Sequence, residues 1–158
     1  MARILRRFGK RLYMDKIKEF FQSYEQRFND GVQGRNEDPK AMAAAFADYF
    51  VESSARGVMG GKNDESFLKA VPEGNAYYRK IGTKRMRVAG LDVTHINEEH
   101  FLVKVHWDSA YDKAGQTIEI GFDVWYLLTS ASGALKIFAY VTGDEQKVLR
   151  EHGLIPEN

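Results

Sequence analysis

The 158-residue sequence contains no cysteine and no unbroken run of about 20 apolar residues. Without cysteine, neither a disulfide scaffold nor cysteine chemistry is available, and we expect a protein of the reducing cytoplasm. Without a long apolar run, no helix of this sequence is expected to span a membrane. Long polar or proline-rich tracts are lacking as well, so the composition is that of a folded chain.

The formal net charge is only +1, which argues against a dedicated nucleic-acid-binding protein. The charge is uneven, because residues 1–13 carry five basic side chains and no acidic one, which leaves about −4 for residues 14–158. Apolar residues in this stretch allow a membrane-surface helix. We favour a loose basic tail over residues 1–13, followed by a single domain over residues 14–158.

Hydrophobic spacing predicts helices first and strands afterwards. A first helix is expected over residues 15–29. Asp38 and Pro39 are typical of a helix start, and the apolar residues that follow give this second helix a buried face, formed by Met42, Phe46, Tyr49 and Phe50. A third helical region is expected from residue 63 or 64 to about residue 82, broken at residues 72–74.

Four strands are predicted over residues 84–96, 100–111, 116–129 and 134–143. Thr142 and Glu145 have the spacing of a capping box for a short C-terminal helix, which Gly153 would end. The order predicts an α+β fold, in which N-terminal helices pack in a strongly curved, mainly antiparallel sheet.

The two predicted hairpins set a register for the last three strands. A four-residue turn over residues 112–115 pairs residue 111 with residue 116, which sets Lys104 opposite Asp123 and His106 on the diagonal. A similar turn over residues 130–133 sets Asp123 opposite Tyr140 and Trp125 opposite Phe138. One face of the predicted sheet therefore gathers Asp123 with charged and aromatic neighbours.

This face is either a solvated surface or the wall of a pocket. Burial alone favours turning the drier face toward the helices, which would leave Asp123 outside; the drier face consists of Val103, Val105, Trp107, Phe122 and Val124. In favour of a pocket, large apolar groups such as Trp125 and Tyr140 are seldom left in water together. The residues leave both interpretations open.

The order and lengths of the elements over residues 15–143 resemble the cone fold of the nuclear transport factor two-like superfamily, which includes ketosteroid isomerase and SnoaL-like polyketide cyclases. The segments that carry the resemblance are "SYEQRFNDG", "FDVWYLL" and "YFVESSARG". The resemblance implies that Tyr24, seven residues before Gly31, and a protonated Asp123 donate hydrogen bonds to a substrate oxygen. Ser53 falls where the isomerase has its carboxylate base, and a serine hydroxyl is too weak for that role.

The resemblance further implies that the Asp123 face lines the pocket and that the opposite, apolar face of the sheet meets a second copy of the chain. Glu52 would then point to the other side of its strand from Ser53, and His106 would be the acid or base. The remaining predicted ligand contacts are Lys104, Trp125, Phe138, Tyr140, Tyr49, Tyr78 and Arg56, the last to hold a substrate carboxylate at the pocket mouth.

We therefore predict a small-molecule pocket in a homodimer. The expected activity is that of an isomerase, cyclase or dehydratase acting on a small apolar or aromatic carbonyl compound, with no cofactor and no metal. The four histidines lack metal-ligand spacing. The alternative is a non-catalytic ligand-binding or dimerisation module of the same fold.

Overall fold

The computed structural model describes residues 2–35 and 37–157, with side chains from residue 9 onward. Helices α1 (Ala2–Val32) and α2 (Pro39–Ala43) come first, followed by strands β1 (Phe46–Ser54) and β2 (Gly57–Lys62) and by helix α3 (Glu65–Lys80). Strands β3 (Thr83–His95), β4 (His100–Lys113), β5 (Gln116–Thr129) and β6 (Lys136–Thr142) precede the short helix α4 (Glu145–Glu151). The predicted α+β fold is confirmed, and the four long predicted strands agree with the observed ones to within two residues.

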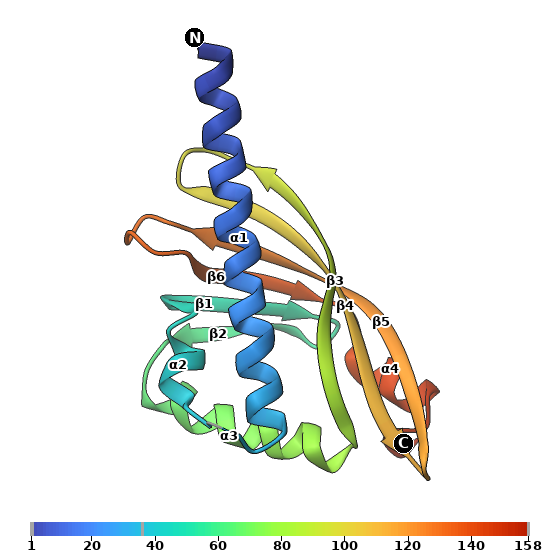
Figure 1. The fold of residues 1–158 in the computed structure, drawn as a ribbon. Helices are drawn as coiled ribbons and strands as arrows, with labels where there is room; N and C mark the ends of the chain where they lie inside the picture. Colours follow the sequence, from blue (N-terminus) through green and yellow to red (C-terminus); the bar gives the residue numbers. More distant parts are fainter. Residues whose placement is uncertain (1, 36, 158) are drawn as a thin grey trace.

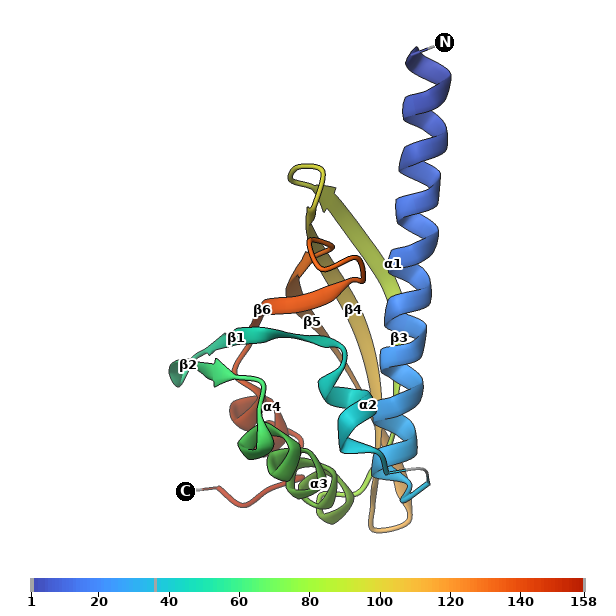
Figure 2. The ribbon, with the colours of Figure 1, turned by 90° about the vertical axis from the view of Figure 1, so that its left-hand side faces the viewer.

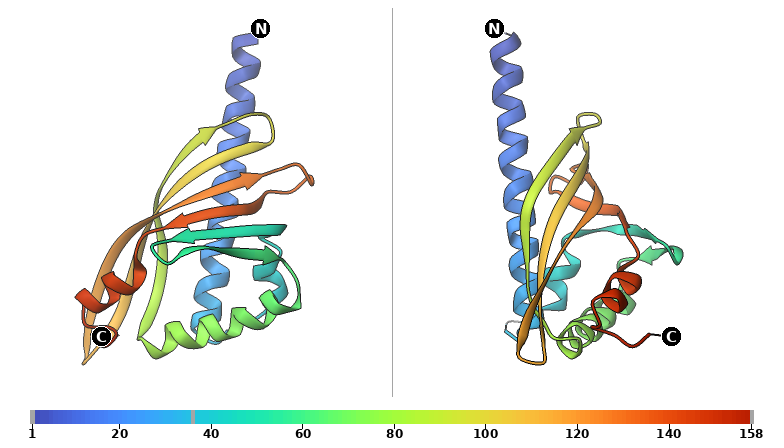
Figure 3. Two further views of the ribbon diagram at one scale, coloured as in Figure 1. Left: turned by 180° about the vertical axis from the view of Figure 1, so that it is seen from behind. Right: turned by 90° about the vertical axis from the view of Figure 1, so that its right-hand side faces the viewer.

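Within the described residues, six strands form one sheet in the order β2-β1-β6-β5-β4-β3. Only β1 and β6 pair in parallel, and the other pairs are antiparallel. The sheet curls, and α1 runs along one side of it while α2 and α3 lie toward one end (Figures 1 and 2). Helix α4 lies beside α3 (Figure 3), and the Tyr78 hydroxyl of α3 bonds to Glu145 of α4.

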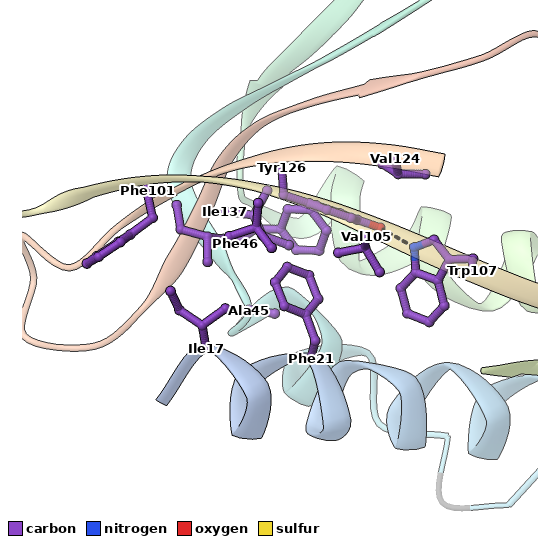
Figure 4. Close-up of a cluster of buried hydrophobic side chains, with 12 residues drawn as sticks. Ile17, Phe21, Ala45, Phe46, Phe101, Val105, Trp107, Val124, Tyr126 and Ile137 are labelled. Atoms are coloured by element: carbon purple, nitrogen blue, oxygen red, sulfur yellow. Dashed lines mark hydrogen bonds between the residues drawn. The ribbon is translucent and has the colours of Figure 1, made fainter. Parts of the chain in front are cut away.

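The drier face of the sheet packs against α1. Figure 4 shows Val105 and Trp107 of β4 and Tyr126 of β5 pointing toward Phe21 of α1. Phe21 is fully buried and Trp107 is 2% exposed. The Trp107 indole N–H donates a hydrogen bond of 3.2 Å to the Tyr126 hydroxyl, which satisfies a polar group inside the core. The drier face of the sheet therefore packs against the helices, as the hydrophobic pattern alone predicted.

Helix α2 is much shorter than the predicted second helix, whose apolar face extended to Phe50. Asp38 does cap it, accepting a hydrogen bond from the Lys40 N–H, and Pro39 is its first residue, both as predicted. The helix ends at Ala43, however, and Phe46 and Phe50 belong to β1. Residues four apart share a face in a helix and also in a strand, so their spacing fits both structures.

Three further helix predictions are corrected. The basic segment is helical from Ala2 rather than loose, and the first turns of α1 project beyond the sheet (Figure 1). Helix α3 continues through Pro72, with Asp64 as its N-cap. The N-cap of α4 is Asp144, whose side chain accepts from the Lys147 N–H, and not Thr142.

The β4–β5 hairpin is tighter than predicted, with a two-residue turn at Ala114 and Gly115, both at positive φ. This moves the register by two residues and keeps every side chain on its predicted face. The β5–β6 register moves by two residues at Thr129 and Leu128 and, after an irregularity between Leu128 and Leu127, by three residues from Leu127 to Val124. Tyr140 consequently pairs with Tyr126 on the helix-facing side and not with Asp123.

Candidate functional site

Asp123, His106 and Lys104 meet on the outer face of the sheet, with His106 rather than the predicted Lys104 directly opposite Asp123. Asp123 alternates with the buried Val124, so its side chain points away from the helices. His106 Nδ1 lies 2.5 Å from one Asp123 oxygen, and Lys104 Nζ lies 3.6 Å from the other. His106 Nε2 bonds to Asp92 at 2.9 Å, a partner that the sequence did not predict.

The predicted pair of oxygen donors is therefore not assembled. Tyr24 packs on the inner side against Trp107 and Tyr126. The Asp123 carboxylate bonds to His106 and Lys104 on the outer side, although the Asp123 segment of β5 forms part of the wall of the inner cavity. Strand alternation separates the two groups, whereas the resemblance implied that the Asp123 face of β5 lines the pocket.

A cavity of about 660 Å³ lies on the inner side, between the curved sheet and the helices. Its wall combines residues of all four helices and of β1, β3, β4, β5 and β6. The wall is mainly apolar, and aromatic side chains dominate it; they include Tyr24, Phe46, Phe67, Tyr78, Trp107 and Tyr126. This volume suits a small organic molecule.

One region of the cavity is formed by Tyr24, Trp107 and Tyr126. The ring of Tyr24 lies 6.1 Å from that of Trp107 and 6.1 Å from that of Tyr126, measured between centroids. Burial, with the nearby charge of Glu52, raises the pKa of Tyr24 to about 12. Burial also raises the pKa of Tyr126 well above its usual value. Both hydroxyls therefore keep their protons at neutral pH.

Glu52 supplies a carboxylate to this cavity. It lies on β1 directly opposite Tyr140 of β6, and the Tyr140 hydroxyl donates to a Glu52 oxygen at 3.1 Å. The family resemblance gave Ser53 as the position of the base and placed the Glu52 side chain on the other side of β1, away from the cavity. The signal that was missed is alternation, because Glu52 follows Phe50 by two residues and Phe50 packs in the core.

A second carboxylate, that of Glu145, lies in the first turn of α4. The Tyr78 hydroxyl lies 2.9 Å and 3.3 Å from its two oxygens. Burial is the main cause that raises the pKa of the Glu145 carboxyl, the Tyr78 hydrogen bond lowers it, and the charge of Glu52 raises it further. Glu145 was predicted only as a helix cap, because chain position gives no sign that α4 folds back over the cavity.

The other predicted contact residues divide between the two sides of the sheet. Tyr78 and Tyr140 line the cavity. Tyr49 is 66% exposed, and Arg56 is exposed where β1 turns into β2. Phe138 packs edge-on against His100. Trp125 contributes to the cavity wall, but it is 38% exposed and Lys104 lies 5.3 Å from its ring centroid.

Neither a metal nor a membrane is suggested by the described part of the chain. Residues 2–35 and 37–157 contain no group of three or more His, Asp or Glu side chains arranged to hold a metal ion. None of the helices described there is both long enough and apolar enough to span a membrane. The chemistry that the cavity offers is that of carboxylates and protonated phenols in an apolar setting, which suits proton transfer beside a developing oxyanion.

A family model described as "NTF2-like protein (DUF6841)" matches residues 15–145. An NTF2-like protein with a cystatin-like fold from Novosphingobium aromaticivorans is 9% identical, with a TM-score of 0.70 over 99% of this chain and 97% of that one. A putative scytalone dehydratase from the same organism is 14% identical, with a TM-score of 0.63 over 84% and 83% of the two chains.

A ketosteroid isomerase-like protein from Erwinia carotovora atroseptica is 17% identical to the chain, with a TM-score of 0.58. That similarity covers 82% of this chain and 93% of the other. The sequence matches no curated protein. At these identities the likeness to solved structures shows the fold alone.

Proposed function

The chain belongs to the NTF2-like protein (DUF6841) family, and from that premise we propose that its inner cavity is the active site of a cofactor-free enzyme. The proposed reaction is proton abstraction next to the carbonyl group of a small apolar or aromatic compound, as in an isomerase, cyclase or dehydratase. Solved structures of similar fold include proteins described as ketosteroid isomerase-like and as a putative scytalone dehydratase. The proposal itself rests on the side chains in the cavity.

The observation that carries the proposal is the position of Glu52 among protonated tyrosines. Its carboxylate lies in an aromatic cavity, and one of its oxygens accepts from Tyr140. The second oxygen remains for a substrate proton. Carboxylates perform this step in many enzymes, and a positioned general base contributes about 10²- to 10⁴-fold to a rate.

Tyr24 and Tyr126 are the proposed oxygen-side donors. Removing a proton beside a carbonyl group sends negative charge to the carbonyl oxygen, and donors aimed at that oxygen lower the barrier. Because the pKa of Tyr24 is raised to about 12, its proton stays in place as the charge develops. Glu52 therefore takes the role that the sequence left vacant at Ser53, and Tyr126 takes the role assigned to Asp123.

The experiment that tests the proposal is hydrogen–deuterium exchange, which needs no knowledge of the product. A panel of small aromatic and cyclic ketones is incubated with the protein in D₂O, and the loss of signals from protons next to the carbonyl is followed by proton NMR. We expect exchange of at least one compound by the wild type and a loss of about 10²-fold or more in Glu52→Gln. Asp48→Asn removes an exposed carboxylate from the same strand and is the matched control.

Asp123→Asn separates this proposal from the one that the sequence suggested. If exchange depends on the outer carboxylate and not on Glu52, the inner site is refuted. If the wild type exchanges no compound of the panel above the buffer rate, the protein is not an enzyme of this class.

The alternative function is a ligand-binding or dimerisation module, and one observation favours the second part of it. The outer sheet face carries a cross-strand row of Val58, Ser53, Val141 and Trp125, in which the three apolar side chains are exposed. A second copy of the chain covering this row would remove apolar area from water. The sequence analysis predicted that the drier face of the sheet forms the dimer interface, but α1 covers that face. The proposed interface is therefore the outer row.

A further inference from the structure

The cavity has a charge of one sign. Glu52 and Glu145 both line it, and among the described residues no lysine, arginine or histidine does. Asp123 and Asp144 also contribute to the wall, but their carboxylates are engaged elsewhere. Asp123 bonds to His106 and Lys104, and Asp144 caps α4. Two carboxylates and a wall of aromatic rings therefore face the same space.

We propose that the ligand of this cavity is an organic cation, an apolar or aromatic molecule whose ammonium group binds at Glu145. The inference rests on the proposed function for the identity of the site and adds the chemical class of the substrate. For the proposed reaction, the substrate is an amine-bearing carbonyl compound.

The electrostatic reason is the cost of two carboxylates in one cavity. Glu145 is accessible to solvent at the start of α4, but it lines the same cavity as Glu52, and two like charges that share a cavity repel each other. Burial raises the pKa of the Glu145 carboxyl, and the charge of Glu52 raises it further. Arg56 lowers it, but Arg56 is exposed and does not line the cavity. A ligand ammonium would supply the missing positive charge inside, whereas a ligand carboxylate would add a third negative one.

The aromatic wall supports the same class of ligand. Cations bind to the faces of tryptophan, tyrosine and phenylalanine rings, and such contacts are strongest where water is excluded. Next to Glu145, Tyr78 packs edge-on against Phe28 with ring centroids 5.2 Å apart, and both residues line the cavity. The sequence predicted that Arg56 binds a substrate carboxylate. The proposal reverses the charges, because the Glu145 carboxylate binds a substrate cation.

Two regions of the cavity bind the two ends of the proposed substrate. The ammonium group binds beside Glu145 and Tyr78, and the carbonyl oxygen binds beside Tyr24 and Tyr126. The carbon that loses its proton then lies within reach of Glu52. A cavity of about 660 Å³ has room for one aromatic ring and a short chain that carries both groups.

The test uses three probes of nearly equal shape: 4-phenylbutylamine, 4-phenylbutan-1-ol and 4-phenylbutanoate, which are positive, neutral and negative at pH 7.5. Their dissociation constants are measured by calorimetry on the wild type, on Glu145→Gln and on Glu151→Gln. Glu151 lies on the same helix, and its exposed carboxylate is near Lys147, so this variant is the matched control.

We expect the amine to bind about tenfold or more tightly than the alcohol, as for a hydrogen bond to a charged group, and the acid to bind most weakly. Glu145→Gln should reduce the preference for the amine to about threefold or less and leave the alcohol unchanged, while Glu151→Gln should match the wild type. Lowering the pH should weaken amine binding, because protonation removes the Glu145 charge.

The inference is overturned if the alcohol or the acid binds as tightly as the amine, if Glu145→Gln binds the amine like the wild type, or if no probe binds. The exchange experiment on Glu52 is independent of these outcomes. Exchange of a neutral ketone without any preference for amines would retain the proposed reaction and reject the cationic substrate. Amine binding without any exchange would retain the cation site and reject the enzyme.

Discussion

The Tyr140 hydroxyl and the Glu52 carboxylate meet across the parallel pair of strands β1 and β6, at 3.1 Å. Two local irregularities accompany this contact. One lies in the β1–β6 pairing between Phe46 and Val51, and the other lies in the β5–β6 pairing near Leu127. The shift near Leu127 brings Tyr140 to the inner side of the sheet, where Glu52 lies by alternation with Phe50, and both residues line the aromatic cavity.

Tyr140→Phe is expected to lower the exchange rate about tenfold, because it removes one hydrogen bond to the charged base and keeps the ring. Tyr140 is a positioning residue in this scheme, so kcat should fall while KM changes little. Kinetics of the exchange reaction check this, with Ser53→Ala as a variant of the neighbouring residue. An equal rise in KM would instead assign Tyr140 to substrate binding.

Tyr24→Phe is expected to lower kcat by about 10²-fold or more, as the removal of an oxyanion donor does in other enzymes. The ring and its contacts with Trp107 and Tyr126 remain, so the melting temperature should change little. The two measurements together distinguish a donor from a structural hydroxyl. A variant that melts much earlier and loses activity in proportion would show only a packing role.

His106 on the outer face is expected to contribute a stability that depends on pH. Its hydrogen bonds to Asp92 and then to Asp123 raise the pKa of its imidazole above the usual value. A pKa raised by folding adds stability that is fully present below the unfolded value of about 6.5 and is lost as the pH rises through the folded value.

The variant His106→Asn should therefore melt earlier than the wild type at pH 6, and the difference should shrink toward pH 9. Thermal melts across this range measure it, with His152→Asn for comparison, and an NMR titration of the His106 ring gives the folded pKa directly. A difference that stays constant with pH would mean that the ring acts by packing.

A substitution in the outer apolar row is expected to change the oligomeric state. Trp125 is 38% exposed and Val141 is 47% exposed, and the two residues are paired on neighbouring strands. If a second copy covers them, Val141→Lys introduces a buried, unpaired charge and should yield monomers. Light scattering after size-exclusion chromatography measures the mass. The idea is rejected if the wild type is a monomer at all concentrations tested.

The sequence predicted the parts of the fold that depend on local chemistry. Alternation and turn residues located four strands, and Asp38 with Pro39 marked the start of α2. The choice between the sheet faces also followed from burial, since Val105 and Trp107 form the drier side. The family resemblance placed the site on the Asp123 face of the sheet. The structure instead agrees with the hydrophobic pattern, which turned the drier face toward the helices.

The cavity was only partly predictable, for a physical reason. Tyr24, Tyr78 and Tyr140 were selected, and all three line it. Glu52 was not selected although its alternation with Phe50 was readable in the sequence. The position of Glu145 depends on how α4 folds back, and the side on which Tyr140 lies depends on a register shift, which are tertiary effects. A shift of one residue in a strand moves a side chain to the other face, and no local pattern fixes such a shift within an irregular pair.

Glu145→Gln is expected to raise the melting temperature at neutral pH. Burial raises the pKa of this carboxyl, so the folded protein binds its proton more tightly than the unfolded chain does. Stability therefore falls as the pH rises from the unfolded value of about 4.5 through the raised value. At pH 7 the ionised carboxylate carries this cost, and glutamine does not. Near pH 4 the two proteins should melt alike, and Glu151→Gln should show no such pH-dependent gain.

A group that costs stability where it stands is typical of a binding site. The cost should disappear when a cation occupies the cavity, because the ligand pairs the charge. Saturating 4-phenylbutylamine should accordingly raise the melting temperature of the wild type at pH 7 and change that of Glu145→Gln much less. If the variant is less stable than the wild type at pH 7, the hydrogen bonds from Tyr78 outweigh the burial of the charge. Glu145 would then be a structural link between α3 and α4 rather than the site of a ligand.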